Sequence, residues 1–264
     1  MSDATIATEL AGGVLRITLN RPDKRNALDA PTIAAFTAEL KRCAADDQVR
    51  VVQITGAGEV FCAGADLVEM QAQARSTEAE NVVHAQQLAM LLAELDSLPK
   101  PTLARVNGDG YGGALGLLAA CDIVIAADHA RFAFTEVRLG IIPAVVSPFV
   151  LAKIGERAAL RYFLTAETLT AATLKEIGLV HEVARAGLLD SACALMTEAL
   201  LKGAPGALAA AKVLIRDMAN APARRRAQDS LSMATRLAQL RVKDEAQEGF
   251  SAFFAKRKPT WRSH

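Results

Sequence analysis

The sequence predicts an α/β fold over residues 1–195 and a helical region over residues 196–264. Three observations lead to this division. Short apolar strand patterns alternate with helical patterns as far as Phe134, and two glycine-rich turns follow strands in that part of the chain. From Glu156 onward the apolar spacing is mainly that of helices. Alternating strands and helices are typical of an α/β layer, whereas a succession of helices forms a layer of its own.

The first elements are a strand, a helix and a second strand. Residues 15–19 alternate between apolar and polar side chains, which is the period of a half-buried strand. Asp29 is a suitable N-cap for a helix whose apolar residues recur at helical spacing between 33 and 43. The apolar run 49–55 predicts the second strand, because a glycine turn closes it.

The middle of the chain continues this alternation. Residues 67–80 are polar and alanine-rich and fit either a helix or a loop, whereas the leucines between 88 and 98 predict a helix that stops at Pro99. A second helix is expected at 114–121, directly after the glycine-dense turn 107–113. Further strands are expected at 102–106, 123–127 and 131–134. The later helices are expected at 157–164, 171–177, 187–201, 207–219, 229–240 and 244–255.

The charge balance excludes two classes of partner. The chain has 30 Lys and Arg against 29 Asp and Glu, a formal net charge of +1. Nucleic acids and anionic membrane surfaces are bound through a dominant basic field, so neither is expected as a partner. Hydrophobic residues make up 52% of the chain and aromatic ones only 5%, which predicts a globular protein with an aliphatic core.

No membrane span, leader peptide or metal centre is expected. The longest uncharged stretch beyond the N-terminal third, residues 139–152, contains two prolines and is shorter than the roughly 20 apolar residues of a spanning helix. The first nine residues lack the basic and apolar parts of a secretory signal. We therefore expect a cytoplasmic protein with reduced thiols. No pair among the cysteines or histidines has metal-ligand spacing: Cys43, Cys62, Cys121, Cys193, His84, His129 and His181.

Two glycine-rich turns are the strongest local candidates for chemistry. They comprise residues 61–67 and 110–116, and neither matches a dinucleotide-binding or P-loop pattern. Glycine permits unusual dihedral angles and close approach of a ligand, and a helix beginning after Gly113 would present free N–H groups. Two such turns facing one another would cradle a developing oxyanion, although each is also consistent with a simple tight turn.

The order of the motifs points to one family. The motifs are Asn20–Pro22 with Asn26–Leu28, Phe61–Leu67, Asn107–Gly113 with Cys121–Asp122, Arg131–Phe132 with Glu136–Pro143, and Glu248–Pro259. Together they resemble the enoyl-CoA hydratase/isomerase (crotonase) family from about residue 10 to 262. The resemblance implies a spiral of ββα units and a C-terminal helical region that makes trimer contacts, with trimers often pairing into hexamers. It implies no separate cofactor, because coenzyme A is part of the substrate.

The same resemblance assigns the catalytic groups. Ala63 and Gly113 match the two positions whose backbone N–H groups bind the thioester carbonyl, and Glu136 matches the catalytic glutamate. Fixed amides stabilise the enolate that forms when water adds to the double bond, and a carboxylate near the double bond moves the proton. Phe132, Phe134, Leu139 and Ile141 suggest an apolar pocket around Glu136, whereas an ion pair with Arg138 is the alternative.

The sequence departs from the family pattern at Gly116. Two-glutamate hydratases have their second glutamate at this position, so only one catalytic carboxylate is expected. Single-glutamate patterns occur in Δ3,Δ2-enoyl-CoA isomerases and in bacterial hydratases of branched, acidic acyl groups, and residues 135–149 resemble the latter. The expected function is therefore hydration of an α,β-unsaturated acyl-CoA, with 3-methylglutaconyl-CoA of leucine catabolism as the specific candidate. An isomerase and a non-catalytic CoA-binding subunit stay open as alternatives.

Further positions are expected to contact the acyl-CoA. Lys24 and Arg25 match the strip at the coenzyme A entrance, and Phe253 and Lys256 match C-terminal positions that meet its adenine and phosphates, often from a neighbouring subunit. Tyr111 either reaches the acyl pocket with its hydroxyl or only packs. The remaining binding positions are Ala63, Gly64, Ala65, Asp66, Leu67, Gly112 and Gly113. The helix at residues 30–41 carries a single lysine, so RNA binding through it is not expected.

Overall fold

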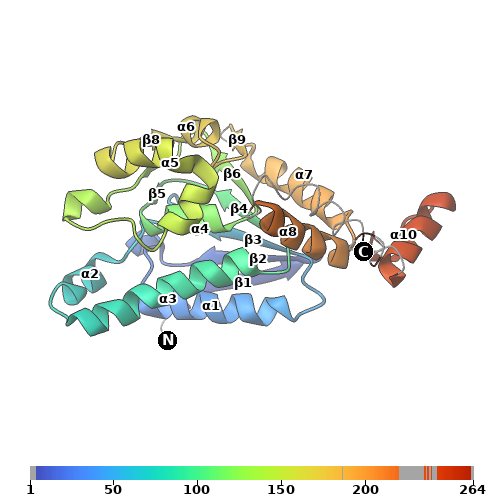
Figure 1. The fold of residues 1–264 in the computed structure, drawn as a ribbon, viewed down its shortest axis with the longest axis horizontal. Coiled ribbons are helices and arrows are strands. Elements are labelled where there is room, and N and C mark those ends of the chain that lie inside the picture. Colours follow the sequence, from blue (N-terminus) through green and yellow to red (C-terminus); the bar gives the residue numbers. More distant parts are fainter. Residues whose placement is uncertain are drawn as a thin grey trace.

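The computed structural model describes residues 4–185, 187–219, 235, 237, 239 and 243–262, and its centre is a six-stranded sheet (Figure 1). The strand order is β1-β2-β3-β4-β6-β9. The first two strands form an antiparallel hairpin, and every later pair is parallel. The strands are β1 (Ile6–Ala11), β2 (Val14–Leu19), β3 (Val51–Gly56), β4 (Thr102–Val106), β6 (Ile123–Ala127) and β9 (Glu182–Ala184).

Helices cover both faces of this sheet. The helices α1 (Ala30–Ala44) and α3 (Glu78–Ser97) pack on one another and bury Phe36 and Leu92 in the main core. On the opposite face α7 (Leu189–Leu201) packs on β4 and β6 and forms a second, smaller core. Neighbouring residues of one strand point to opposite faces of a sheet, so both cores draw on the same strands.

A second layer carries the elements that approach the site. A three-stranded sheet is formed by β5 (Gly110–Tyr111), β7 (Arg131–Ala133) and β8 (Leu169–Thr170). The helix α4 (Gly113–Ala120), which is buried from Ala114 onward, lies between α3 and α5 (Ser147–Thr165). The short helices α2 (Leu67–Gln73) and α6 (Ala171–Glu176) complete this part of the chain. Residues 67–80, which fitted a helix or a loop, thus contain α2 and the start of α3.

The C-terminal helices depart from the predicted boundary. The division after residue 195 falls inside α7, a continuous helix that packs on the main sheet, so the α/β core extends at least to Leu201. After it come α8 (Pro205–Ala219) and α10 (Asp244–Phe254), and α10 lies apart from the sheet (Figure 1). The helix expected at 229–240 lies outside the described residues except at 235, 237 and 239, which are helical.

All four cysteines are buried and free. Within the described part of the chain, no helix is long and apolar enough to cross a membrane.

Candidate active site

The two glycine-rich turns lie side by side. The N–H groups of Phe61 and Cys62 both donate to the Asp109 carbonyl at 3.1 Å, and the Tyr111 N–H donates to the Cys62 carbonyl at 3.1 Å. A Cβ atom on Gly64 would lie 2.6 Å from the Tyr111 carbonyl oxygen, and the φ of Gly64 is +87°. Only glycine permits both the angle and the approach. The two turns therefore face one another, which is the arrangement that an oxyanion cradle would require.

Ala63 does not have the role that the sequence suggested. Its N–H donates to the carbonyl of Arg25 at 2.9 Å, and the residue does not line the pocket described below. An amide committed to an internal carbonyl is not free to bind a substrate oxygen. The assignment of Ala63 as an oxyanion donor is therefore wrong, and its hydrogen bond instead joins the first glycine turn to the segment before α1.

Ala65, two residues later, has the free amide. On either side of it, the Gly64 carbonyl accepts from Leu28 at 2.7 Å and the Asp66 N–H donates to the Leu28 carbonyl at 3.2 Å. Peptide groups alternate in direction along an extended segment, so the Ala65 N–H points to the other side. The amide of Gly113, the first residue of α4, begins a helix and has no intrahelical partner. Among the described residues, no hydrogen bond uses either amide.

Ala65, Gly113 and Glu136 line one cavity of about 320 Å³. The Gly113 nitrogen lies 3.6 Å from the position that a Cβ on Gly64 would take, so the two donors come from adjacent backbone segments. The other walls are mostly apolar and come from α1, α2, α3 and the loop 141–146. The lining residues are Leu28, Ile33, Ala65, Asp66, Glu69, Met70, Gln73, Asn81, His84, Ala85, Gln87, Leu88, Gly113, Glu136, Ile141, Ile142, Pro143, Ala144, Val145 and Val146.

Glu136 has the environment of a proton-transfer group. It begins a short 3-10 turn after β7, and its Oε2 is buried without a hydrogen-bond partner. Its Oε1 lies 3.2 Å from the position that a Cβ on Gly112 would take, so the carboxyl group rests against the second glycine turn. Burial raises the pKa of Glu136, and a hydrogen bond from its own backbone N–H offsets only part of that effect.

The alternative of an ion pair with Arg138 does not hold, since no ion pair in the described residues joins Glu136 to Arg138. The predicted apolar surroundings are confirmed only in part. Phe132 and Phe134 are buried, whereas Leu139 and Ile141 are 58% and 51% exposed. Ile141 still lines the cavity, while Leu139 lies outside it. The apolar wall next to Glu136 therefore comes from the loop 141–146, of which the sequence assigned only Ile141 to the site.

Gly116 lies on the buried side of α4, where no room exists for a second carboxylate. A Cβ at this position would lie 2.5 Å from Cγ1 and 3.1 Å from Cβ of Val146, and 3.0 Å from Cδ1 of Leu92. Ordinary carbon–carbon contacts are about 3.5–4.0 Å. Val146 is 2% exposed and lines the cavity with its neighbours. An aliphatic side chain thus fills the space beside Gly116, and Glu136 is the free carboxylate of the cavity.

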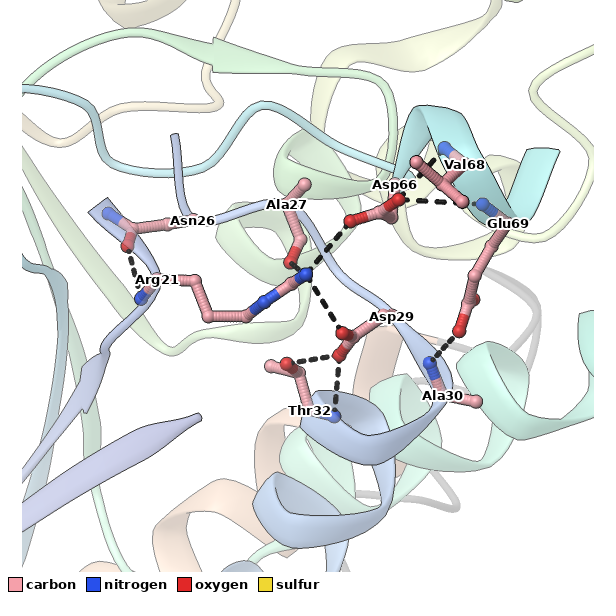
Figure 2. A network of polar contacts seen from close by, with 9 residues as sticks. All are labelled: Arg21, Asn26, Ala27, Asp29, Ala30, Thr32, Asp66, Val68 and Glu69. Atoms are coloured by element: carbon pink, nitrogen blue, oxygen red, sulfur yellow. Dashed lines mark hydrogen bonds and ion pairs between the residues drawn. The ribbon is translucent and has the colours of Figure 1, made fainter. Parts of the chain in front are cut away.

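The two other carboxylates of the cavity are already engaged (Figure 2). Asp66 accepts hydrogen bonds from the N–H groups of Val68 and Glu69 and pairs with Arg21 at 3.0 Å. Burial tends to raise the pKa of Asp66, but these hydrogen bonds and the guanidinium outweigh it and lower the pKa. The Glu69 carboxylate accepts from the N–H of Ala30 at 2.8 Å. Asp66 therefore holds the wall of the cavity and starts α2.

Arg21 ties three segments together. Its guanidinium contacts Asp66, Asp29 at 3.0 Å and the Ala27 carbonyl at 2.8 Å (Figure 2). Asp29 in turn caps α1 by accepting from Thr32 at 2.9 Å. The sequence identified the cap but not this network, because the partners are 8 and 45 residues from Arg21.

Several predicted binding residues lie at the edge of the cavity or away from it. Leu67 is 78% exposed and does not line it. The Tyr111 hydroxyl donates to Asp109 at 3.1 Å, and Arg25 pairs with the same carboxylate at 3.7 Å. The Tyr111 hydroxyl is therefore directed to the carboxylate that Arg25 also contacts, and Tyr111 does not line the cavity. Lys24, next to Arg25 in the sequence, is exposed. Gly64 and Gly112 shape the backbone, whereas Ala65, Asp66 and Gly113 line the cavity itself.

Phe253 and Lys256 do not meet the cavity of their own chain. They belong to α10 and the turn after it, and α10 lies at the opposite end of the molecule from α2 (Figure 1). Phe253 and its neighbour Phe254 are 76% and 79% exposed. Their expected contact with coenzyme A would need a second copy of the chain.

The chain is similar to a known family and to known proteins over nearly its whole length. The model of the family described as enoyl-CoA hydratase/isomerase matches residues 9–264. A 2,3-dehydroadipyl-CoA hydratase of Escherichia coli is 33% identical over 94% of this chain and 95% of that protein. The crystal structure of an enoyl-CoA hydratase from Shewanella pealeana is 39% identical, with a TM-score of 0.92 over 97% of this chain and 96% of that one. The structure of Pseudomonas aeruginosa AtuE is 36% identical, with a TM-score of 0.91 over 98% of this chain and 100% of that one.

Proposed function

Because the chain belongs to the enoyl-CoA hydratase/isomerase family and is an enzyme of the hydratase type, we propose that it hydrates a 2-enoyl-CoA whose acyl group carries a second carboxylate. The specific candidate is 3-methylglutaconyl-CoA. One relative supports this class by its name, since a 2,3-dehydroadipyl group also has a distal carboxylate. The crotonase fold itself is common to several reactions, so the site and not the fold distinguishes hydration from the others.

The observation that carries the function is the meeting of Glu136 with the amides of Ala65 and Gly113 in one cavity. In the proposed reaction the thioester carbonyl accepts from both amides. Water adds to C3 while Glu136 takes one of its protons, and the electron pair of the double bond moves onto the thioester as an enolate. Glu136 then gives that proton to C2, so one water molecule is added and the carboxylate is restored.

A single carboxylate has to perform both proton transfers in this scheme. The space beside Gly116 is filled by Val146 and Leu92, and Asp66 and Glu69 are engaged in hydrogen bonds. The raised pKa of Glu136 suits this double role, because a carboxyl group that holds a proton more readily can accept it and return it. The amides act mainly on the enolate, and loss of one such donor costs roughly 3–4 kcal/mol in the transition state.

Replacement of Glu136 by Gln tests the function. The change keeps the shape of the side chain and removes the titratable group, so kcat for hydration should fall by at least about a thousandfold while binding of the acyl-CoA stays within about tenfold. The reaction is followed by loss of enoyl-thioester absorbance. Glu156→Gln, an exposed glutamate on α5, is the matched control and should keep wild-type activity. Substantial hydration by Glu136→Gln would refute the scheme.

Isomerisation is the second candidate, and the filled space beside Gly116 is the observation that favours it. One carboxylate suffices to move a proton between C2 and C4 of a 3-enoyl-CoA. The two activities are separated by supplying 3-enoyl-CoA and 2-enoyl-CoA in parallel. Hydration of the 2-enoyl substrate supports the main proposal, whereas conversion of the 3-enoyl substrate without hydration supports the isomerase.

We also propose that the enzyme assembles as a trimer or as a dimer of trimers. The exposed Phe253 and Phe254 on α10 form an apolar surface that a second copy would cover, and a partner would thereby bring Phe253 and Lys256 toward coenzyme A. We expect the apolar residues Leu231, Met233, Leu237 and Leu240 of the helix at 229–240 to lie partly between subunits. Leu237 is described and is 55% exposed, while the other three lie outside the described residues. Light scattering of the purified protein measures the mass, and a monomer would overturn this assembly.

A further inference from the structure

His84 is the one side chain in the lining of the catalytic cavity, as far as the chain is described, that can carry a positive charge. We propose that it recognises the distal carboxylate of the acyl group and thereby sets the preference for dicarboxylic substrates. This inference rests on the proposed function for the identity of the thioester, but the role of His84 in binding is testable without catalysis.

The position of His84 on α3 suits a group at the far end of the acyl chain. Leu88 contacts the catalytic end of the cavity, since its Cδ2 lies 3.6 Å from the place of a Cβ on Gly113. His84 is four residues earlier and therefore lies on the same helix face as Leu88. A rise of 1.5 Å per residue separates the two by about 6 Å along the helix axis, close to the length of a four- to five-carbon acyl group. The cavity thus runs along α3 from Gly113 toward His84.

His84 is free to bind a ligand, unlike most polar groups around it. Its side chain is half-buried and makes no hydrogen bond or ion pair with the described residues. Asn81, one turn earlier, donates to the carbonyls of Gln73 and Ser76 at 3.0 and 3.4 Å. Asp66 and Glu69 are engaged as described above. The electrostatic neighbour of His84 is Glu80, whose carboxylate caps α3 by accepting from the Thr77 N–H and hydroxyl.

A carboxylate inside this cavity needs such a group. The surrounding wall is formed largely by apolar residues, and a carboxylate buried there without a donor carries a large desolvation penalty. An imidazole donates a hydrogen bond to a carboxylate whether neutral or protonated, and the protonated form adds charge. Gln87 and Gln73 also line this cavity, and their side chains contain neutral donors. Arg138, the cation nearest to Glu136 in the sequence, does not line the cavity.

The test compares binding of two saturated acyl-CoAs that cannot be hydrated. Glutaryl-CoA has the distal carboxylate and butyryl-CoA lacks it, and calorimetry gives Kd for each with the wild type, His84→Leu and His84→Gln. We expect His84→Leu to raise the Kd of glutaryl-CoA by about 10- to 100-fold, as for loss of a charge-assisted hydrogen bond. The Kd of butyryl-CoA should stay within about threefold of the wild-type value. His84→Gln should recover part of the loss, because it keeps a donor. The matched control is His129→Leu, an exposed histidine in the turn between β6 and β7, which should change neither Kd.

Each outcome decides the role of His84. Equal weakening of both ligands by His84→Leu would show a structural effect and overturn the inference, as would an unchanged Kd for glutaryl-CoA or equal wild-type affinity for both ligands. Failure of the proposed function is measured separately, by the hydration of glutaconyl-CoA and crotonyl-CoA by the wild type. Selective binding through His84 without hydration of either would refute the hydratase proposal and leave the inference standing.

Discussion

Replacement of Gly116 by Ala tests whether Val146 fills the place of a second catalytic carboxylate. The new methyl group would lie 2.5 Å from Cγ1 of Val146, about 1 Å closer than an ordinary carbon contact. Val146 is 2% exposed, is the N-cap of α5 and belongs to the main core, so moving it away from the new methyl group would disturb its packed neighbours. Overpacking of this kind costs about 1–3 kcal/mol, while the better helix propensity of alanine in α4 returns about 1 kcal/mol. We expect a net loss of up to about 2 kcal/mol.

A double-mutant cycle isolates the contact. Val146→Ala alone should cost about 2–3 kcal/mol, because it removes buried methyl groups and leaves a cavity. In Gly116→Ala/Val146→Ala the new methyl enters part of that cavity, so the combined loss should be smaller than the sum by about 1–2 kcal/mol. Thermal midpoints at matched protein concentration measure the series, and for a chain of this size each 1 kcal/mol corresponds to about 2–4 °C.

Two results would refute this reasoning. If Gly116→Ala raised the midpoint, the helix propensity would act alone and the space would be empty. If the two substitutions were additive within about 0.5 kcal/mol, Val146 and position 116 would not share a contact. In either case the lack of a second carboxylate would follow only from the identity of residue 116 and not from the packing around it.

Two further predictions concern the carboxylates of the cavity. Burial raises the pKa of Glu136, so the folded state favours the protonated carboxyl group. The resulting contribution to the free energy of unfolding is fully present below the ordinary pKa of 4.5 and is lost as the pH rises through the raised pKa of the folded state. Glu136→Gln should therefore have a higher thermal midpoint than the wild type at pH 8, and the two should converge below pH 4.5 in a midpoint-versus-pH series; a lower midpoint at pH 8 would contradict this. The pKa of Asp66 is lowered, so its contribution is present above 3.8 and is lost as the pH falls through the lowered value. Asp66→Asn should cost about 1–3 kcal/mol at pH 7, and this deficit should narrow in acid, whereas a deficit independent of pH would show that the ion pair is not its cause.

The sequence predicted elements well where the burial pattern is local. The strand β2 alternates between buried and exposed side chains, and α1 has a capping residue and regular apolar spacing, so both were identified. The edge strand β1 was missed because its residues are mostly exposed and leave no alternation. The two-residue strand β5 was hidden within a glycine turn, since only its pairing with β7 makes it a strand.

The same distinction applies to the site: residues with a local signature were predictable, and those defined by distant contacts were not. Glycine turns and a glutamate leave local signatures, and these placed Gly113 and Glu136 correctly in one cavity. The choice of Ala63 failed because the direction of an amide depends on pairing with a distant segment, here Arg25 and Leu28. His84 gave no signal beyond being an isolated histidine. Its significance appears only when α3 is packed against the second glycine turn.

The hydrogen bonds and ion pairs of Arg21 position residues of the cavity, although Arg21 itself does not line it. The direction of the Ala65 amide is set by the two hydrogen bonds between its neighbours and Leu28. The segment that contains Leu28 is held in place by the guanidinium of Arg21, which lies outside the cavity lining. The same guanidinium anchors the start of α1 and, through Asp66, the start of α2. Substitution of Arg21 would therefore leave the Ala65 amide in place but make its orientation less well defined. It would also loosen the starts of α1 and α2, which form two walls of the cavity. The orientation of the proposed oxyanion donor therefore depends on how three segments are joined, and not on the donor residue alone.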